Sequence, residues 1–428
     1  MFDSTQYLHR RRFLKVATGT GALVAMPRVI PGAVLGKDGN VPPSERIVMG
    51  GIGIGGRGSY DLGCFLQEPD VQFAAVCDVR VERREAAKKT VDRRYRNQDC
   101  ATYRDLRELL ARPDIDAVLV ATQINWHGLA SILAARAGKD VYCEKPCTKS
   151  IAESLALAET FRRTGRLFQA GTQRRSIPHF MFAVELARSG KLGKLREVHA
   201  SPLGMGVGIR GPASMKPDLP EPSKEEFDWD LFLGPTAWHP YKQNYRRGGG
   251  IVGVLGEGTT PWGSHTVDLC QWANDADRTA PVEYEPPANG QVAACYANGV
   301  KLVMRDSGWI GLGSCPVRFE GETGWVEAGD SGKLAVSSPA LLAGKKVAEI
   351  GGYPATFHIR NFLDCVKSRA QPRANADAAC QTHIACHAAN IAIFLGRKLQ
   401  YDPTKNEFIG DEQANRLRCE ALREPWRV

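Results

Sequence analysis

Short apolar runs and helical patterns alternate through the first 170 residues of the chain. Buried strands of a parallel sheet read as continuous apolar runs, whereas helices repeat their apolar positions every three to four residues. Strands are predicted at 46–52, 71–77, 115–122, 141–142 and 167–171, and helices at 59–67, 80–94, 103–111, 130–139 and 153–164. This alternation predicts an α/β domain built on a doubly wound parallel sheet.

The pattern changes from about residue 172 onward. Short segments of alternating polarity occur near 196–202, 291–304, 317–320 and 325–327, and glycine-rich turns separate them. They predict a second, α+β domain with a mostly antiparallel sheet, and helical spacing at 180–189, 357–366 and 378–396 predicts its helices. The Gly- and Pro-rich region 204–226 is interpreted as a long surface loop or arm.

A glycine-rich loop follows the first predicted strand directly and opens the first predicted helix. This context is the one that a GxGxxG motif needs, because its glycines let the backbone approach a pyrophosphate at the helix N-terminus. A second register beginning at Gly51 also fits, but the later one lets Ile52 end the strand. The loop residues predicted to hold a cofactor are Gly53, Gly55, Gly56, Arg57 and Gly58.

An acid stands where the next predicted strand ends. Asp78 follows Gly58 by 20 residues, the spacing at which an acid binds the ribose 2′-OH of a dinucleotide. Because a carboxylate repels a 2′-phosphate, NAD is the predicted cofactor. Arg80, two residues farther on, keeps NADP open as an alternative.

The segment Glu144-Lys145-Pro146 follows a short apolar strand pattern. Pro146 fixes its own φ and biases Lys145 toward an extended backbone. Open α/β sheets bind ligands at the carboxyl ends of their strands, so a lysine held there is a candidate catalytic residue. The alternative is an ordinary surface Glu–Lys pair beside a turn, and the nucleotide motif upstream favours the catalytic interpretation.

Length and composition are those of a globular protein with two domains. The chain has 428 residues, of which 43% are apolar and 24% charged, as is usual for soluble proteins. The net charge is +9, but residues 1–36 hold five basic residues against one acid, which leaves +5 scattered over the rest. No basic patch indicates a nucleic-acid partner. We predict a signal segment at 1–36, a dinucleotide-binding domain at 44–170, a substrate domain at 171–400 and a tail at 401–428.

The N-terminus resembles a targeting signal rather than folded structure. Arg10-Arg11-Arg12-Phe13-Leu14-Lys15 matches the twin-arginine export pattern, and a weakly apolar run follows at 16–25. This predicts export to the periplasm, with a disordered basic tail as the alternative. The run is too short and glycine-rich to span a bilayer, and no other segment reads as long and apolar enough, so no span is predicted in the mature chain.

The twelve cysteines contain no CxxC pair. The closest pairs, Cys143 with Cys147 and Cys380 with Cys386, lie in apolar contexts without other metal-ligating residues. We therefore predict free, buried thiols and no metal site.

Four motifs together resemble the glucose–fructose oxidoreductase/inositol dehydrogenase (Gfo/Idh/MocA) family. They are the glycine loop at 52–58, Glu144-Lys145-Pro146, the Gly-Thr-Gln-Arg sequence at 171–174 and the Trp-Gly-Ser-His-Thr-Val-Asp sequence at 262–268. The similarity covers roughly residues 45–400. A Trp-Asp-Leu-Phe-Leu-Gly-Pro segment at 229–235, combined with the twin-arginine signal, resembles an exported branch of this family.

The resemblance implies a Rossmann domain joined to a domain with a large open-faced sheet, whose free face often forms homo-oligomers. The nicotinamide would lie between the domains and exchange hydride with a secondary alcohol of a sugar, a polyol or a derivative. Lys145 would contact substrate and cofactor with a lowered pKa, because burial and a positively charged nicotinamide both disfavour its ammonium form. His265 would accept the substrate's hydroxyl proton, unless it is a structural histidine. Asp268 would have a supporting role or be a structural acid.

Further residues are assigned by the same resemblance. Thr122, Trp126, His127, Glu144 and Lys145 would contact the cofactor, and Gln173, Arg174 and His265 the substrate. Arg174 would bind an acidic sugar or face the solvent, and Arg175 and His179 would also line the pocket. Trp238, Tyr241 and Tyr245 would stack on sugar rings or pack in the interior.

Two segments depart from the family pattern. Pro261 stands where many members have an aspartate, and Glu257, where glycine is usual, is a candidate replacement. The loop 121–127 keeps Trp126 and His127 but carries Gln123-Ile124-Asn125 between them and Thr122, instead of the usual Pro-Asp-His.

Three functions follow from these motifs: an NAD(P)-dependent sugar or polyol oxidoreductase, a glycoside-cleaving enzyme that uses bound NAD transiently for oxidation and elimination, and a non-catalytic sugar-binding or regulatory protein. Pro261 favours the last two relative to an unaltered family member.

Overall fold

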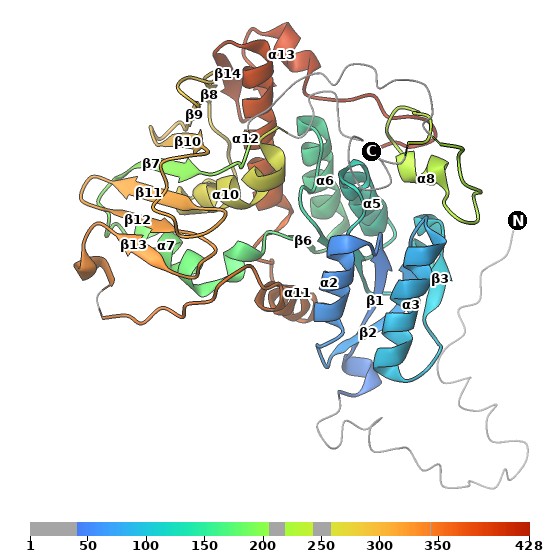
Figure 1. Ribbon diagram of the computed structural model, residues 1–428. Coiled ribbons are helices and arrows are strands. Elements are labelled where there is room, and N and C mark those ends of the chain that lie inside the picture. The colour runs from blue at the N-terminus through green and yellow to red at the C-terminus, as the bar shows by residue number, and fades with distance from the viewer. Residues whose placement is uncertain (1–40, 205–218, 243–257, 343) are drawn as a thin grey trace, which may run out of the picture. The chain divides into compact units, whose positions relative to one another are not determined.

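The computed structural model of the protein describes residues 41–204, 219–242, 258–342 and 344–428, and Figure 1 labels their elements. The predicted doubly wound sheet is present, with six parallel strands in the order β3-β2-β1-β4-β5-β6. The order reverses between β1 and β4, the point at which open sheets bind ligands beyond their carboxyl ends. The strands are β1 (Ile47–Ile52), β2 (Val71–Cys77), β3 (Ala101–Tyr103), β4 (Ala117–Val120), β5 (Asp140–Cys143) and β6 (Phe168–Ala170).

Helices connect these strands, as parallel pairing requires. They are α2 (Gly56–Phe65), α3 (Val81–Tyr95), α4 (Leu106–Leu110), α5 (Ile124–Arg136) and α6 (Ile151–Thr164). The helix expected at 103–111 is present only as α4, because the chain divides there into strand β3, which ends at Tyr103, and a helix that begins at Leu106. Asp105 causes the division, because its carboxylate accepts a hydrogen bond from the Arg107 amide and so caps a helix that begins at Leu106.

A second sheet has the strand order β13-β12-β11-β7-β10-β9-β8-β14-β15. Its pairs are antiparallel except for β7 with β10, which agrees with the predicted mostly antiparallel domain. The strands are β7 (Leu195–Ala200), β8 (Glu283–Tyr284), β9 (Gln291–Cys295), β10 (Lys301–Arg305), β11 (Val317–Gly321), β12 (Trp325–Ala328), β13 (Leu334–Val336), β14 (Leu399–Asp402) and β15 (Glu407–Phe408).

Helices α7 (Pro178–Arg188), α10 (Thr260–Ala273) and α12 (Ala376–Leu395) pack against this sheet and form one large apolar core with it. The strand predicted at 291–304 is a hairpin, because the chain turns at Tyr296 and returns after Gly299, whose φ is +85°. The tail, in which the sequence showed little pattern, supplies β14, β15 and α13 (Glu412–Arg416).

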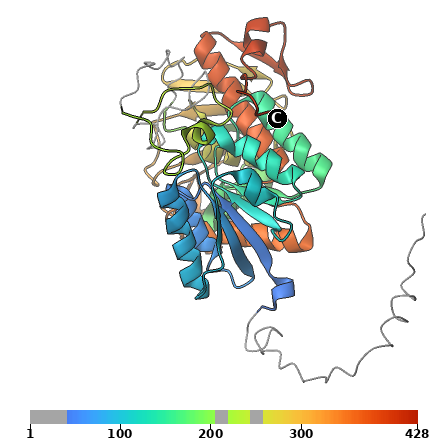
Figure 2. The ribbon, with the colours of Figure 1, turned by 90° about the vertical axis from the view of Figure 1, so that its right-hand side faces the viewer.

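Two segments beyond residue 170 pack on the first sheet's half of the protein. Helix α11 (Thr356–Ser368) contributes Ile359, Phe362 and Leu363 to an apolar core shared with β1, β2 and α2, and Figure 2 shows α11 in orange beside the blue strands. Helix α8 (Trp229–Leu233) lies against α5, as hydrogen bonds from Asn125 and Trp126 show. The dinucleotide-binding half is therefore completed by residues far along the chain.

Helix α12 is long and apolar enough to cross a membrane by length and composition, contrary to the sequence-based expectation that no such segment follows residue 36. However, 78% of its most apolar window is buried inside the protein. It packs on α10 and α6, which explains its hydropathy as that of a core helix. The cysteine prediction is confirmed, since all twelve thiols are free and ten are buried.

Candidate active site

The glycine loop between β1 and α2 has a geometry that side chains would disrupt. Gly53 has φ +76°, and a Cβ on it would lie 2.5 Å from the Cα of Thr122. A Cβ on Gly58 would lie 2.9 Å from the carbonyl oxygen of Gly53. Gly55 is the N-cap of α2 and offers no side-chain cap, so the first amides of the helix are open to an anion such as a pyrophosphate.

A cavity of about 320 Å³ opens above this loop. Gly53, Gly55, Gly56 and Arg57 line it together with Thr122, while Gly58 supports the loop from beneath. Because a Cβ on Gly56 would meet nothing within 4 Å, the space beside it is available to a ligand. These residues fit the phosphates of a dinucleotide.

Asp78 lines the same cavity, at the carboxyl end of β2. Its carboxylate accepts a hydrogen bond of 2.9 Å from the Arg80 amide, and burial raises its pKa. Arg80 is 3% exposed, and its guanidinium lies 4.6 Å from the Phe227 ring centre. Arg80 packs beneath aromatic rings but lines the cavity together with Asp78, whose carboxylate suits an unphosphorylated ribose.

Glu144, at the end of β5, is held by three donors. Its Oε1 accepts from Arg57 Nε (3.3 Å) and Gln173 Nε2 (2.7 Å), and its Oε2 accepts from the Lys145 amide (3.2 Å). Glu144 therefore joins the glycine loop to the segment that carries Lys145. Gln173, predicted to contact substrate, is 1% exposed and positions Glu144 instead.

Lys145 reaches from the first sheet to the N-terminus of α10. Its Nζ donates to the carbonyl oxygen of Pro261 (3.0 Å) and lies 4.7 Å from the Trp262 ring centre. Burial lowers the pKa of Lys145, and the charge of Arg174 lowers it further, whereas Glu144 opposes the shift. The predicted direction of this pKa is therefore found, and Pro261 contributes through its backbone although its side chain has no acid.

His265 lies on α10, one turn after Pro261, and is 3% exposed. Burial and the charges of Arg174 and Lys145 lower its pKa well below the ordinary histidine value, so the imidazole is neutral at pH 7. Among the residues that the structure describes, none forms a hydrogen bond with its Nδ1. A neutral imidazole with an unused nitrogen can accept a proton from a ligand.

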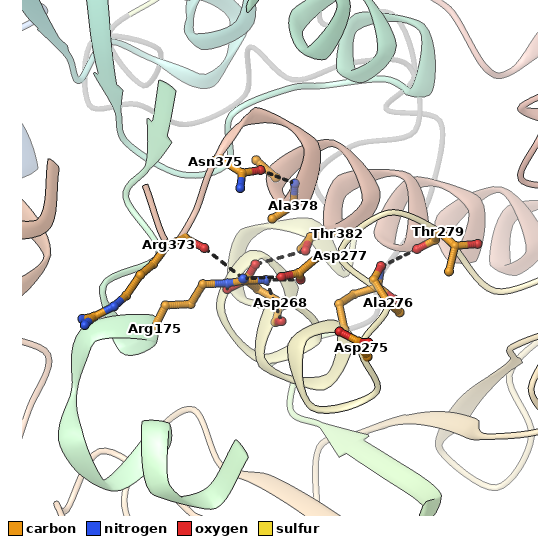
Figure 3. Close-up of polar contacts among 12 residues, drawn as sticks. Arg175, Asp268, Asp275, Ala276, Asp277, Thr279, Arg373, Asn375, Ala378 and Thr382 are labelled. Atoms are coloured by element: carbon orange, nitrogen blue, oxygen red, sulfur yellow. Dashed lines mark hydrogen bonds and ion pairs between the residues drawn. The ribbon is translucent and has the colours of Figure 1, made fainter. Parts of the chain in front are cut away.

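Asp268 points away from this pair. Its carboxylate accepts from Arg175 Nε (2.7 Å) and Thr382 Oγ1 (3.1 Å), and Arg175 also binds Asp277 (2.6 Å), as Figure 3 shows. Asp268 is 2% exposed. Its contacts are those of a structural acid that joins α10 to the segment before α7, which was one of the two predicted roles.

Arg174 is buried rather than facing solvent. It is 1% exposed, and its Nε and Nη2 bind the two oxygens of Asp330 at 2.9 and 2.5 Å. Its guanidinium also lies 5.1 Å from the ring centre of Tyr353, and its Nη1 has no hydrogen-bond partner among the described residues. The solvent-facing alternative is therefore wrong.

The structure separates the remaining predicted residues by environment. Trp126 lines the cavity, whereas the His127 ring lies between the carbonyl oxygens of Pro146 (2.6 Å) and Thr122 (3.0 Å) and supports both loops. His179 contacts the Gly329 carbonyl, Tyr241 is buried and Trp238 is 51% exposed. Tyr245 and Glu257 lie outside the described residues.

The sequence did not indicate several residues that shape this site. Asp330 and Tyr353 hold Arg174, and the Pro261 carbonyl holds Lys145. Only the Gly329-Asp330-Ser331-Gly332 turn carried a signal, and turn composition alone does not indicate an arginine partner 156 residues away.

Comparisons with known proteins agree with this geometry. Residues 46–172 match a Gfo/Idh/MocA profile described as an oxidoreductase family with an NAD-binding Rossmann fold, and residues 213–428 match the profile of its C-terminal alpha/beta domain. A scyllo-inositol 2-dehydrogenase (NAD(+)) of Bacillus subtilis is 40% identical over 87 residues, which are 20% of this chain and 25% of the relative. A glycosyl hydrolase family 109 protein of Shewanella sp. (strain ANA-3) is 32% identical over 172 residues, 37% and 38% of the two chains.

The match thus spans less than half the length of these curated relatives. A crystal structure of an oxidoreductase from Agrobacterium radiobacter, in complex with NAD⁺, L-tartaric acid and magnesium, superposes with a TM-score of 0.56 at 16% identity. The superposition covers 83% of this chain and 98% of that one. At this identity the likeness shows a shared fold.

Proposed function

Because this chain belongs to the Gfo/Idh/MocA oxidoreductase family, we propose that it transfers hydride between nicotinamide and a secondary alcohol of a sugar, a polyol or a derivative. The observation that carries the proposal is the position of Lys145. It joins the cofactor loop, through Glu144 and Arg57, to the N-terminus of α10, which carries His265.

In this reaction each group has its own role in hydride or proton transfer. NAD bound over the glycine loop supplies the hydride acceptor. Lys145 Nζ binds the hydroxyl oxygen of the substrate and stabilises the charge that develops on it, since its lowered pKa brings proton exchange closer to neutral pH. The neutral imidazole of His265 takes the hydroxyl proton, and the guanidinium of Arg174 donates to a neighbouring oxygen of the substrate.

The test is to purify the protein, identify any nucleotide it releases, and follow reduced-nicotinamide absorbance with a panel of sugars and polyols. Sustained formation of reduced nicotinamide supports the proposal. Lys145→Ala should abolish turnover while NAD binding persists, and Lys89→Ala, which removes an exposed lysine on α3, should leave turnover intact. Unchanged turnover in Lys145→Ala refutes the catalytic assignment.

A second function is favoured by the glycosyl hydrolase family 109 relatives. In it, oxidation at one sugar carbon acidifies the neighbouring C–H, that proton and a substituent leave by elimination, water adds across the new double bond, and the hydride then returns to the sugar. No net reduction of NAD results. Release of an aryl leaving group without accumulation of reduced nicotinamide distinguishes this function from the first.

Export and assembly belong to the same proposal. The twin-arginine motif at 10–15 supports periplasmic export of a folded, cofactor-loaded protein. Replacing Arg10 and Arg11 by lysine should retain the protein in the cytoplasm, and cell fractionation measures this. Neighbouring strands β11, β7, β10 and β9 of the second sheet form the surface proposed for a homo-oligomer, and light scattering of the purified protein measures its mass.

A further inference from the structure

The segment 226–235, which contains the Trp-Asp-Leu-Phe-Leu-Gly-Pro motif, pairs with the loop that carries Asp78. The Asp228 amide donates to the carbonyl oxygen of Val79 (3.1 Å), and the Val81 amide donates to that of Glu226 (3.0 Å). Arg80 and Phe227 form an antiparallel bridge between these bonds. The backbone after β2 is thus held by residues nearly 150 positions farther along the chain.

The same segment is fixed to the loop after β4. Asn125 Nδ2 donates to the carbonyl oxygens of Phe232 (3.1 Å) and Leu233 (2.9 Å), and Trp126 Nε1 donates to that of Leu231 (2.8 Å). These bonds satisfy carbonyls at the end of α8, which have no partner within the helix. The altered sequence at 123–125 therefore has a structural role, since an asparagine amide carries two protons for two acceptors.

As a result, Leu231 and Phe232 form part of the wall of the cofactor cavity. The apolar part of that wall includes Val79, Leu106, Trp126, Leu231 and Phe232. Cys77 pairs with Ile52, the residue directly before the glycine loop, so Asp78 lines the cavity beside this loop. A ligand with its phosphates at the loop and its ribose at Asp78 places its base among these side chains.

The C-terminal tail secures the segment from outside. Arg423 donates through Nε to the carbonyl oxygen of Gly234 (3.0 Å) and through Nη2 to that of Asp230 (2.8 Å). Trp426 packs on Trp126 with ring centres 4.7 Å apart. Arg423 does not line the cavity, so it acts on the wall only by holding the segment in place.

We infer that the segment 226–235 is the adenine-binding wall of the NAD site, and that Arg423 is its positioning residue. This inference rests on the NAD-dependent function proposed above. It gives the motif at 229–235 a binding role in the first domain, although the motif lies in the second half of the chain.

The test compares the binding of AMP, nicotinamide mononucleotide and NAD by calorimetry. Phe232→Ala should raise the dissociation constants of AMP and NAD about tenfold or more, because it removes an aromatic contact with the base. The dissociation constant of nicotinamide mononucleotide should not change. Phe357→Ala, the same substitution at a 45% exposed position on α11, is the control and should bind all three as the wild type does.

Leu231→Ala is a second cavity variant for the case that Phe232→Ala does not fold, because Leu231 is only half-buried. Arg423→Gln should accelerate NAD dissociation several-fold in stopped-flow measurements. Wild-type affinity for AMP in both cavity variants overturns the inference, as does an equal loss for nicotinamide mononucleotide. Wild-type protein that binds NAD but oxidises no sugar refutes the oxidoreductase function alone, because these binding measurements do not depend on turnover.

Discussion

Glu153 offers a quantitative test of burial in this fold. Its side chain lies in α6 and is 4% exposed, and its Oε2 accepts a hydrogen bond from the Lys149 amide (2.8 Å). Its Oε1 is buried against α5 with no hydrogen-bond partner in the part of the chain that the structure describes, and a Cβ on Gly128 would lie 2.6 Å from it. Burial raises the pKa of this carboxyl from 4.5 to about 7, opposed by Lys149 and assisted by Glu420.

The direction in which stability changes with pH follows from proton binding. Because the folded state has the higher pKa, it binds more protons than the unfolded chain between pH 4.5 and about 7, so stability falls as pH rises through that window. Each pKa unit corresponds to about 1.4 kcal/mol. The expected loss attributable to Glu153 between pH 5 and pH 8 is therefore about 2.5 kcal/mol, as an order of magnitude.

Glu153→Gln removes the titration and keeps an acceptor for the Lys149 amide. The quantity to compare is the free energy of unfolding in urea, variant minus wild type. We expect this difference to be about 2 to 3 kcal/mol larger at pH 8 than at pH 5. Other titrating groups cancel in the difference between the two proteins. Glu159→Gln, on the exposed side of α6, should show no such difference, and a pH-independent effect of Glu153→Gln refutes the reasoning.

Backbone conformation, a buried ion pair and thiol exposure can each be tested by one variant or reagent. Gly53→Ala should reduce stability by about 2 kcal/mol or more and abolish NAD binding, because Gly53 has a positive φ and an added Cβ would contact Thr122. As a control, Gly63→Ala, which adds a Cβ in open space on α2, should stabilise the protein by about 0.5–1 kcal/mol. Asp330→Asn should lower the free energy of unfolding by about 3–5 kcal/mol, because it leaves the charge of Arg174 buried and unpaired. As a control, Asp377→Asn at an exposed ion pair should lower it by less than about 1 kcal/mol. A thiol reagent should label exposed Cys419 rapidly in the native protein and twelve cysteines after unfolding.

The fold was predictable because its signals are local. The glycine loop, Asp78 and the strand-like runs each lie within a single βαβ unit, and the sequence placed them correctly. The environment of Arg174 was not predictable, because its exposure depends on Asp330, which approaches only when the second sheet forms. The sequence likewise predicts His127 as a pocket residue, yet both of its ring nitrogens form hydrogen bonds with backbone carbonyls of two different loops.

Pro261 acts through its main chain rather than its side chain. A sequence comparison registers only the loss of an aspartate side chain at that position. The folded protein uses the main-chain oxygen, which any residue would provide, to hold Lys145. Side-chain identity is therefore an incomplete guide to hydrogen bonding at a helix N-terminus.

Helix α11 has a consequence for how the protein is made. The core between α2 and the first sheet contains Phe362, whose ring lies 6.4 Å from that of Phe65 and 5.9 Å from that of Tyr142, and His358 binds the carbonyl oxygen of Ala170 at the end of β6. A nascent chain that has emerged only as far as β6 leaves these apolar rings uncovered. The ribosome must therefore synthesise about 190 further residues before the nucleotide-binding half can close, and a chaperone that shields aromatic surface is most needed during that interval.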